Sequence, residues 1–144
     1  MPQWPWKNPR PGVDEYGRNA LWHHALEGNI EALRADLRAG LSPTSPDKDG
    51  NTALHVAVQG GHADAVALLI QAGGDVNATD KHGNGPLWTA GYEASKATAS
   101  EARVSIVTML LKAGADPHHK NRADRTPERW REVSPKVDVA FAAA

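Results

Sequence analysis

Seven histidines give this 144-residue chain its most versatile chemistry, since a neutral imidazole can bind a metal or move a proton. Two pairs are adjacent, His23 with His24 and His118 with His119. Adjacent side chains diverge on a helix or a strand, so such a pair rarely supplies two ligands to one ion. The chain has no cysteine and no pair of histidines at zinc-site spacing. We therefore predict structural or surface roles for the histidines, and no bound metal or cofactor.

The other groups that could support catalysis are scattered. No serine lies in a Gly-x-Ser-x-Gly turn, and no Gly-Lys-Ser/Thr follows the glycines, so neither a nucleophile elbow nor a phosphate loop is indicated. The carboxylates fall mostly near glycines in turns and form no recognisable acid–base pair. The sequence predicts a protein that is not an enzyme.

Charge and composition exclude further classes of function. The net charge is −1, from 16 basic and 17 acidic residues, which argues against a protein that binds nucleic acid by neutralising phosphates. The N-terminal MPQWPWKNPRPG has no apolar stretch of the kind a secretory signal needs, and no apolar run is long enough to span a bilayer. We expect a cytoplasmic, monomeric protein that does not act at a membrane.

The elements that would position these residues are clearest between residues 47 and 80. The segment opens with a turn that ends at Gly50, and Thr52 can cap a first helix. That helix stops at Gly60-Gly61, and a second helix begins after His62 with apolar residues at helical spacing. Neither helix can bury its apolar face alone, so the unit needs neighbours. The spacing supplies them, because glycines and leucines recur every 33 residues at Gly17, Gly50 and Gly83 and at Leu21, Leu54 and Leu87.

The segment TALHVAVQGGHADAVALLIQAGGDVNA resembles the ankyrin repeat, since it follows the T-P-L-H-x-A and G-A-D-V-N landmarks of that family nearly throughout. The resemblance implies an all-α solenoid of stacked helix-turn-helix units with short β-turn hairpins. We expect three repeats and a partial C-terminal capping unit. The predicted boundaries are a Pro/Trp-rich N-terminal arm or cap (1–13), a repeat domain (14–132) with units 14–46, 47–79, 80–120 and 121–132, and a C-terminal tail (133–144).

Several residues depart from the repeat pattern. His24 and Asp36 stand where the second unit has Ala57 and Leu69, which fits an outer unit whose far face meets water. Trp22 and Trp88 both replace His55, and we expect them to pack against neighbouring units or to line the groove, the core being favoured. Trp130 is expected to face the preceding repeat, and Trp4 and Trp6 to seal the first one.

The third unit and the tail are the least regular parts. Gly73 and Gly114 are 41 residues apart, eight more than the period, and the surplus falls in an insertion at 92–103. We expect this insertion to lengthen the flanking helices and their loop, and to contact a partner. A helix is expected to start at Thr126-Pro127 and to end before Pro135. The tail is too short for a full second helix, and we expect it to form one apolar turn through Val137, Val139 and Phe141 that caps the C-terminal end.

The resemblance implies binding of another protein through a concave groove formed by the turns and the first helices. Residues held on a rigid frame lose little entropy on binding, and Tyr and Arg are enriched at interface hot spots. Carried over by position, the expected contact residues are Tyr16, Arg18, Lys48, Asp49, Asn51, Gln59, Lys81, His82, Asn84, Tyr92, Glu93, Arg122 and Arg125.

The kind of binding protein remains open among three hypotheses. The first is an antidote or immunity-type inhibitor that occludes the site of a toxin or effector. The second is a scaffold or assembly subunit, which would co-purify with several proteins. The third, the least favoured, is a metal-binding or enzymatic protein that uses His82, His118 and His119.

Overall fold

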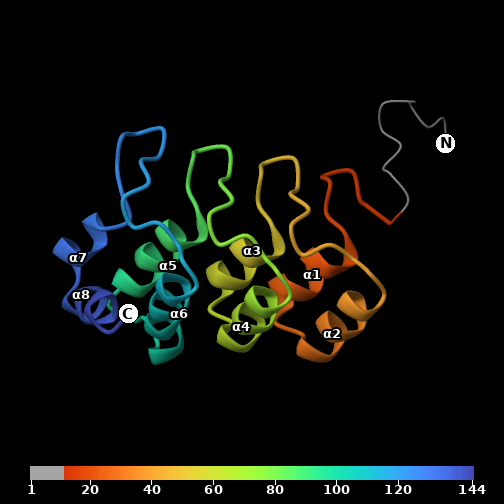
Figure 1. Ribbon diagram of the computed structural model, residues 1–144, viewed down its shortest axis with the longest axis horizontal. Coiled ribbons are helices and arrows are strands. Elements are labelled where there is room, and N and C mark those ends of the chain that lie inside the picture. The colour runs from red at the N-terminus through yellow and green to blue at the C-terminus, as the bar shows by residue number, and fades with distance from the viewer. Residues whose placement is uncertain (1–11) are drawn as a thin grey trace.

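The computed structural model describes residues 12–144, which form eight helices in four antiparallel pairs (Figure 1). Within these residues no strand forms, and one isolated antiparallel bridge joins Val13 to Asn19. The predicted sealing role of Trp4 and Trp6 falls outside the described residues. The helices are α1 (Ala20–Glu27), α2 (Ile30–Arg38), α3 (Ala53–Gly60), α4 (Ala63–Gln71), α5 (Pro86–Ser95), α6 (Glu101–Lys112), α7 (Arg129–Val133) and α8 (Pro135–Ala142).

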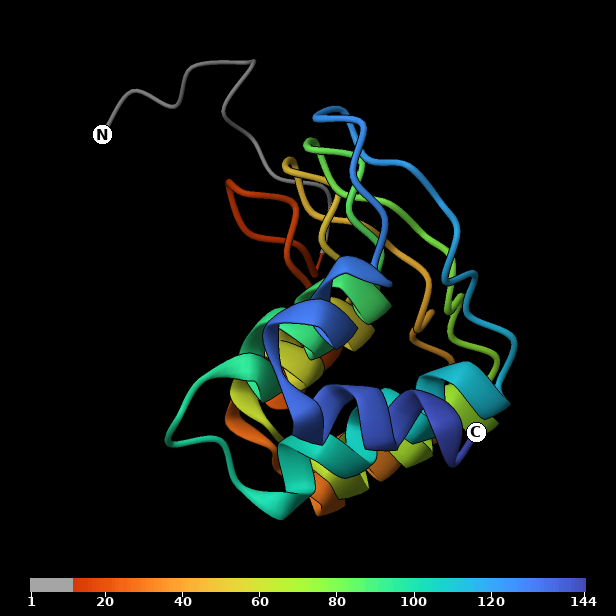
Figure 2. The ribbon, with the colours of Figure 1, turned by 90° about the vertical axis from the view of Figure 1, so that its left-hand side faces the viewer.

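The pairs stack into two layers. The first helices, α1, α3, α5 and α7, pack on one another in order, and so do the second helices, α2, α4, α6 and α8. Between them lies one continuous apolar core that includes Leu21, Leu54, Leu69 and Leu110, all at most 1% exposed. Four turns project from the N-terminal ends of the first helices, at an angle to the helical layers (Figure 2). This is the predicted all-α stack of helix-turn-helix units.

The second unit forms where the sequence predicts it. Thr52 caps α3 and, together with His55 at the third helical position, closes a reciprocal capping box. Gly61 ends α3 in the left-handed region with φ 73°, where a residue without Cβ is under no strain. Six of the eight α3 residues are buried, because the helix has a neighbour on each side as well as its own α4 beneath. This unit is therefore the best packed of the stack.

The insertion lengthens both helices of the third unit, as predicted. α5 has 10 residues, compared with 8 in α1 and in α3. α6 has 12 residues, compared with 9 in α2 and in α4. The loop between α5 and α6 projects beyond the corresponding loops of the other units (Figure 2).

The fourth unit differs from the prediction in two respects. α7 begins at Arg129 and not at Thr126, because residues 126–131 first close i to i+3 hydrogen bonds, a tighter winding than the α-helix. The tail forms the eight-residue helix α8 and not the single apolar turn that the sequence predicts, since Pro135 ends α7 but also starts α8 at a position where a helix needs no N–H. α8 buries Val137 fully, whereas Val139, which was expected in the apolar turn, is 67% exposed.

Candidate protein-binding surface

Four turns of identical construction form the most regular exposed feature of the molecule. They are turn 1 (residues 14–18), turn 2 (47–51), turn 3 (80–84) and turn 4 (121–125). In each, the side-chain Oδ1 of the first residue accepts two backbone N–H groups, from the residues two and four places later, at 2.8 to 3.0 Å. We call these first residues the turn-organising residues: Asp14, Asp47, Asp80 and Asn121.

Each turn is joined to the next by one backbone hydrogen bond. The N–H of Lys48 donates to the carbonyl of Tyr16 (2.8 Å), and that of Lys81 donates to Asp49 (2.8 Å). The N–H of Arg122 donates to the carbonyl of His82 at 3.0 Å. The four tips therefore form a connected row that follows the stacking direction of the helices (Figure 1).

Turn 1 contains a carboxyl group with a strongly lowered pKa, that of Asp14. The Asp14 carboxylate accepts hydrogen bonds from the backbone N–H groups of Tyr16 and Arg18, from Arg18 Nε (3.0 Å) and from His23 Nε2 (3.0 Å). Partial burial raises the pKa of Asp14, but these hydrogen bonds and the charge of Arg18 outweigh it and lower the pKa to about 2. The carboxylate is therefore ionised under all ordinary conditions and holds Arg18 against the turn.

Most of the sequence-predicted contact residues lie along this row and its flank. Arg18, Asn51 and Asn84 close the first three turns and are partly exposed. Gln59 and Tyr92 lie toward the C-terminal ends of α3 and α5, and Tyr92 is 46% exposed. The predicted contact residues that are exposed within the turns themselves are Tyr16, Lys48, Asp49, Lys81, His82, Arg122 and Arg125.

Several of the predicted contact residues are engaged within the molecule, Asn84 and Glu93 among them. Asn84 Oδ1 accepts from Asn121 Nδ2 (2.9 Å), so that its side chain joins turns 3 and 4. The Glu93 side chain is only 13% exposed and pairs with Arg103 (3.2 Å) and Lys96 (3.0 Å). Arg103 also donates to the carbonyl of Gln59 at 2.9 Å, which ties the insertion to the second unit. The repeat pattern could not indicate Arg103, since the insertion has no counterpart in the other units.

The tryptophans pack between units. Trp130 lies against α5, with its ring centroid 5.0 Å from that of Trp88 and 5.5 Å from that of Tyr92. A Cβ added at Gly91 would come within 2.5 Å of the Trp130 ring, so Gly91 is what allows this close approach. Trp22 is 92% buried, its exposed fraction being 8%. Trp130 thus faces the preceding repeat as predicted, and its contact with Tyr92 adds an aromatic edge to the surface beside turn 4.

The histidines mostly bind backbone or carboxylates of neighbouring elements. His55, buried in α3, shares a hydrogen bond with the Asn84 carbonyl through Nε2 (3.2 Å), and burial lowers its pKa below the usual 6.5 despite that carbonyl. His62 Nε2 lies 3.0 Å from the Leu26 carbonyl, and His119 Nε2 lies 3.0 Å from the Gly83 carbonyl. His24 Nδ1 pairs with Asp36 Oδ2 at 2.5 Å, so the two polar departures of the first unit satisfy each other.

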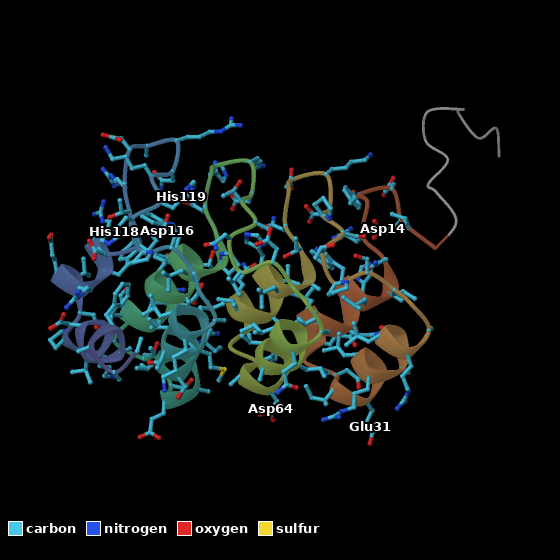
Figure 3. All side chains as sticks on the ribbon, viewed as in Figure 1. Asp14, Glu31, Asp64, Asp116, His118 and His119 are labelled. Carbon is cyan, nitrogen blue, oxygen red and sulfur yellow. The ribbon has the colours of Figure 1, made fainter. Side chains whose placement is uncertain are left out.

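The geometry gives no support to a metal site. Among residues 12–144, no group of three or more His, Cys, Asp or Glu side chains could hold a metal ion. His118, His119 and Asp116 lie near the base of turn 4, far from Glu31 and Asp64 at the opposite ends of the second helices (Figure 3). A recess of about 150 Å³ beside Trp88 and His119 is smaller than the roughly 300 Å³ of typical small-molecule sites.

Comparison with known proteins agrees with the repeat architecture. The sequence profile described as Ankyrin repeats (3 copies) matches residues 21–121. An ankyrin repeat-containing protein of Schizosaccharomyces pombe is 37% identical over 68 residues, which cover 47% of this chain and 33% of that protein. The mouse RelA-associated inhibitor is 35% identical over 91 residues, covering 63% of this chain and 10% of the relative.

A third relative, an Inhibitor of Apoptosis of monkeypox virus, is 35% identical over 79 residues, 52% of this chain and 18% of the viral protein. The chain thus spans a third or less of the length of these relatives. None of the helices in residues 12–144 is long and apolar enough to cross a membrane. The repeats indicate a protein–protein interaction module on a non-enzymatic fold. With glycines and leucines that recur every 33 residues over its first three units, with joined turns and with a profile match over most of its length, the chain belongs to the ankyrin repeat family.

Proposed function

We propose that the chain binds a protein partner across the row of four turns and the exposed flank of the first helices. The observation that carries this proposal is the set of three backbone hydrogen bonds, 2.8 to 3.0 Å long, that join successive turns. Side chains on turns that are already fixed to one another lose less conformational entropy on binding than side chains on independent loops. The row is therefore prepared for a partner that extends over several units.

The composition of this surface fits protein recognition. Tyr16 is 53% exposed at turn 1 and Tyr92 is 46% exposed on α5, and Arg122 and Arg125 are exposed at turn 4. Tyrosine and arginine contribute most of the binding energy at many protein interfaces. Asn84 and Glu93, by contrast, are held by internal hydrogen bonds, and we propose that they position the surface without contacting the partner.

We further propose that binding is inhibitory, in the manner of an antidote that occludes the working site of its target. Two of the similar proteins are named as inhibitors, which is compatible with this mode. A non-catalytic fold can control another protein only by binding it, and covering a site is the simplest way to do so.

The proposal is tested by affinity purification with the full chain as bait, followed by mass spectrometry. The surface variant Lys48→Ala/Tyr92→Ala removes two exposed side chains, and Arg34→Ala/Lys112→Ala is the control, with two exposed side chains removed from the second helices. We expect one stoichiometric partner that the control retains and the surface variant loses, and whose activity the wild-type chain inhibits. Loss of the partner from the control alone would contradict the proposed surface. Capture of several proteins whose activities do not change would favour a scaffold.

A further inference from the structure

Arg18 and Arg125 occupy the same position in turns 1 and 4, but their surroundings differ. In turn 1 the turn-organising residue is Asp14, and its second carboxylate oxygen accepts from Arg18 Nε at 3.0 Å. The Arg18 guanidinium also lies 4.3 Å from the centroid of the Tyr16 ring. The charge of Arg18 is therefore neutralised within its own turn, and 27% of the side chain remains exposed.

Turn 4 keeps the geometry of turn 1 without its negative charge. Asn121 Oδ1 accepts from the N–H groups of Ala123 (2.9 Å) and Arg125 (3.0 Å), as Asp14 does in turn 1. The turn thus needs a side-chain oxygen and does not need a carboxylate. Asn121 is neutral and its Nδ2 donates to Asn84 Oδ1, so Asn121 offers Arg125 no carboxylate to pair with.

The arginines of turn 4 are exposed and lack internal ion pairs. Within residues 12–144, neither Arg122 nor Arg125 forms an ion pair with a carboxylate. The nearby Asp124 pairs with Lys120 at 3.2 Å. Counting ionised residues, turn 1 carries −1 (Asp14 and Glu15 with Arg18), whereas turn 4 carries +1 (Arg122 and Arg125 with Asp124). The row of turns is thus acidic at its first end and basic at its last.

We propose that turn 4 recognises an acidic segment of the protein partner, with Arg122 and Arg125 pairing to its Asp or Glu side chains. A guanidinium presents a planar fork of donors that matches a carboxylate, and these two forks have no such partner within the described part of the chain. The inference rests on the proposed function and names the chemistry at one end of its surface. A nucleic acid is the less favoured ligand, since two arginines contact few phosphates and the whole chain carries −1.

The test uses the full chain and a fluorescein-labelled 12-residue peptide of alternating Asp and Glu, with the Asn/Gln peptide as the neutral probe. Fluorescence anisotropy at low and physiological salt measures the affinity. Arg122→Gln/Arg125→Gln should weaken binding of the acidic peptide at least tenfold. The charge-matched control Arg34→Gln/Arg38→Gln on α2 should change it less than twofold.

Asn121→Asp is the sharper variant, because both arginines remain in place. The new carboxylate can accept the same two backbone N–H groups and can pair with Arg125, as Asp14 pairs with Arg18. The variant also loses the Nδ2 donor to Asn84 that joins turns 3 and 4, so we expect unchanged circular dichroism, a modestly lower melting temperature and at least threefold weaker binding of the acidic peptide.

Three outcomes would overturn the inference: no binding of the acidic peptide at low salt, equal losses in the turn 4 variants and the α2 control, or tighter binding of an RNA oligonucleotide of equal charge. Failure of this inference is distinguishable from failure of the proposed function. A purified partner that stays with Arg122→Gln/Arg125→Gln and with Asn121→Asp, but is lost from Lys48→Ala/Tyr92→Ala, would leave the binding surface standing without an acidic segment.

Discussion

The second and fourth units adopt the same helix-turn-helix fold but have different numbers of neighbouring units. The second unit has neighbours on both sides, and six of the eight residues of α3 are buried. Within residues 12–144 the fourth unit has a neighbour on one side, and its α7 has five residues, none of them buried, and no side-chain cap. At equivalent positions, Leu54 is replaced by Glu128, His55 by Arg129 and Gly50 by Asp124.

The difference shows which requirements of the repeat come from the turn itself and which come from the next unit. Gly50 has φ 82°, and a Cβ on it would lie 3.0 Å from Asp80 Cα of the following turn. Asp124 also has positive φ, 59°, but no described turn follows it. The left-handed conformation therefore belongs to the turn, whereas the absence of a side chain is imposed by the neighbour.

Removing the core side chain of the second unit should have the largest effect. Leu54 is fully buried, and a Leu→Ala change at such a site costs about 2–5 kcal/mol through lost burial and the remaining cavity. We expect Leu54→Ala to lower the free energy of unfolding by that amount in urea titrations. The control in the fourth unit is Val139→Ala, at a side chain 67% exposed, which should cost less than about 0.5 kcal/mol. Equal losses would contradict the difference in packing.

Removing the capping histidine His55 should have the next largest effect on stability. His55→Ala removes the capping box with Thr52 and leaves the Asn84 carbonyl without its imidazole partner. Loss of a cap and of a buried hydrogen bond should together cost about 1–3 kcal/mol. Arg129→Ala, at the same position of the fourth unit, should cost less than about 1 kcal/mol, since Arg129 only lies over the Trp130 ring. Thermal and urea unfolding at pH 7.5 measure both variants.

Replacing Gly50 in turn 2 should show how much stability depends on the absence of a side chain next to turn 3. Gly50→Ala places a Cβ at positive φ and 3.0 Å from the backbone of Asp80. The combined strain should cost about 1–2 kcal/mol in the free energy of unfolding. A loss below about 0.3 kcal/mol would show that turn 3 can move away freely, in contradiction to the backbone hydrogen bond that joins it to turn 2.

Acidification should lower the stability of the chain through His55 of the second unit. Burial lowers the pKa of His55 in the folded chain below the unfolded value of about 6.5. The unfolded state therefore binds the proton more readily, and stability present above pH 6.5 is lost as the pH falls toward the folded pKa. Between pH 7.5 and 5.5, the wild type should lose more stability than His55→Ala, measured by urea unfolding at each pH. Identical pH dependence would show that His55 does not titrate on unfolding.

The sequence is sufficient to predict the repeats because their landmarks act locally. Gly50, Thr52 and Gly61 each fix a turn or a helix end through backbone conformation or a cap, whatever lies nearby. Such signals recur at a fixed period, so the helix pairs and the row of turns could be predicted.

Contacts between helices were not predictable in the same way. His24 and Asp36 were each recognised as outer polar residues, but their pairing depends on the rotation of α1 against α2. Glu93 was placed on the binding surface, whereas its carboxylate is turned to Arg103, which comes from an insertion without a repeat position. That Asn121 is neutral follows from the sequence, but its consequence for Arg125 depends on the pairing of Asp14 with Arg18, which the sequence does not show.

The smallest effect is expected for Asp124→Gly, which introduces glycine in turn 4, the turn that no described turn follows. Asp124→Gly removes the backbone strain of a non-glycine residue at positive φ, which stabilises the folded variant. Against this, glycine makes the unfolded chain more flexible, and the substitution removes an exposed ion pair with Lys120. These terms nearly cancel, so the free energy of unfolding should stay the same or rise by up to about 1 kcal/mol. Because the two substitutions run in opposite directions at the same position of the turn, the contrast lies in their size: exchanging glycine and a side chain should matter more in turn 2, where a Cβ would lie 3.0 Å from Asp80 Cα. Urea unfolding of the two variants in parallel measures the contrast. A loss of more than about 1 kcal/mol in Asp124→Gly would mean that the carboxylate itself holds turn 4 together, and the charge of that turn could then not be separated from its structure.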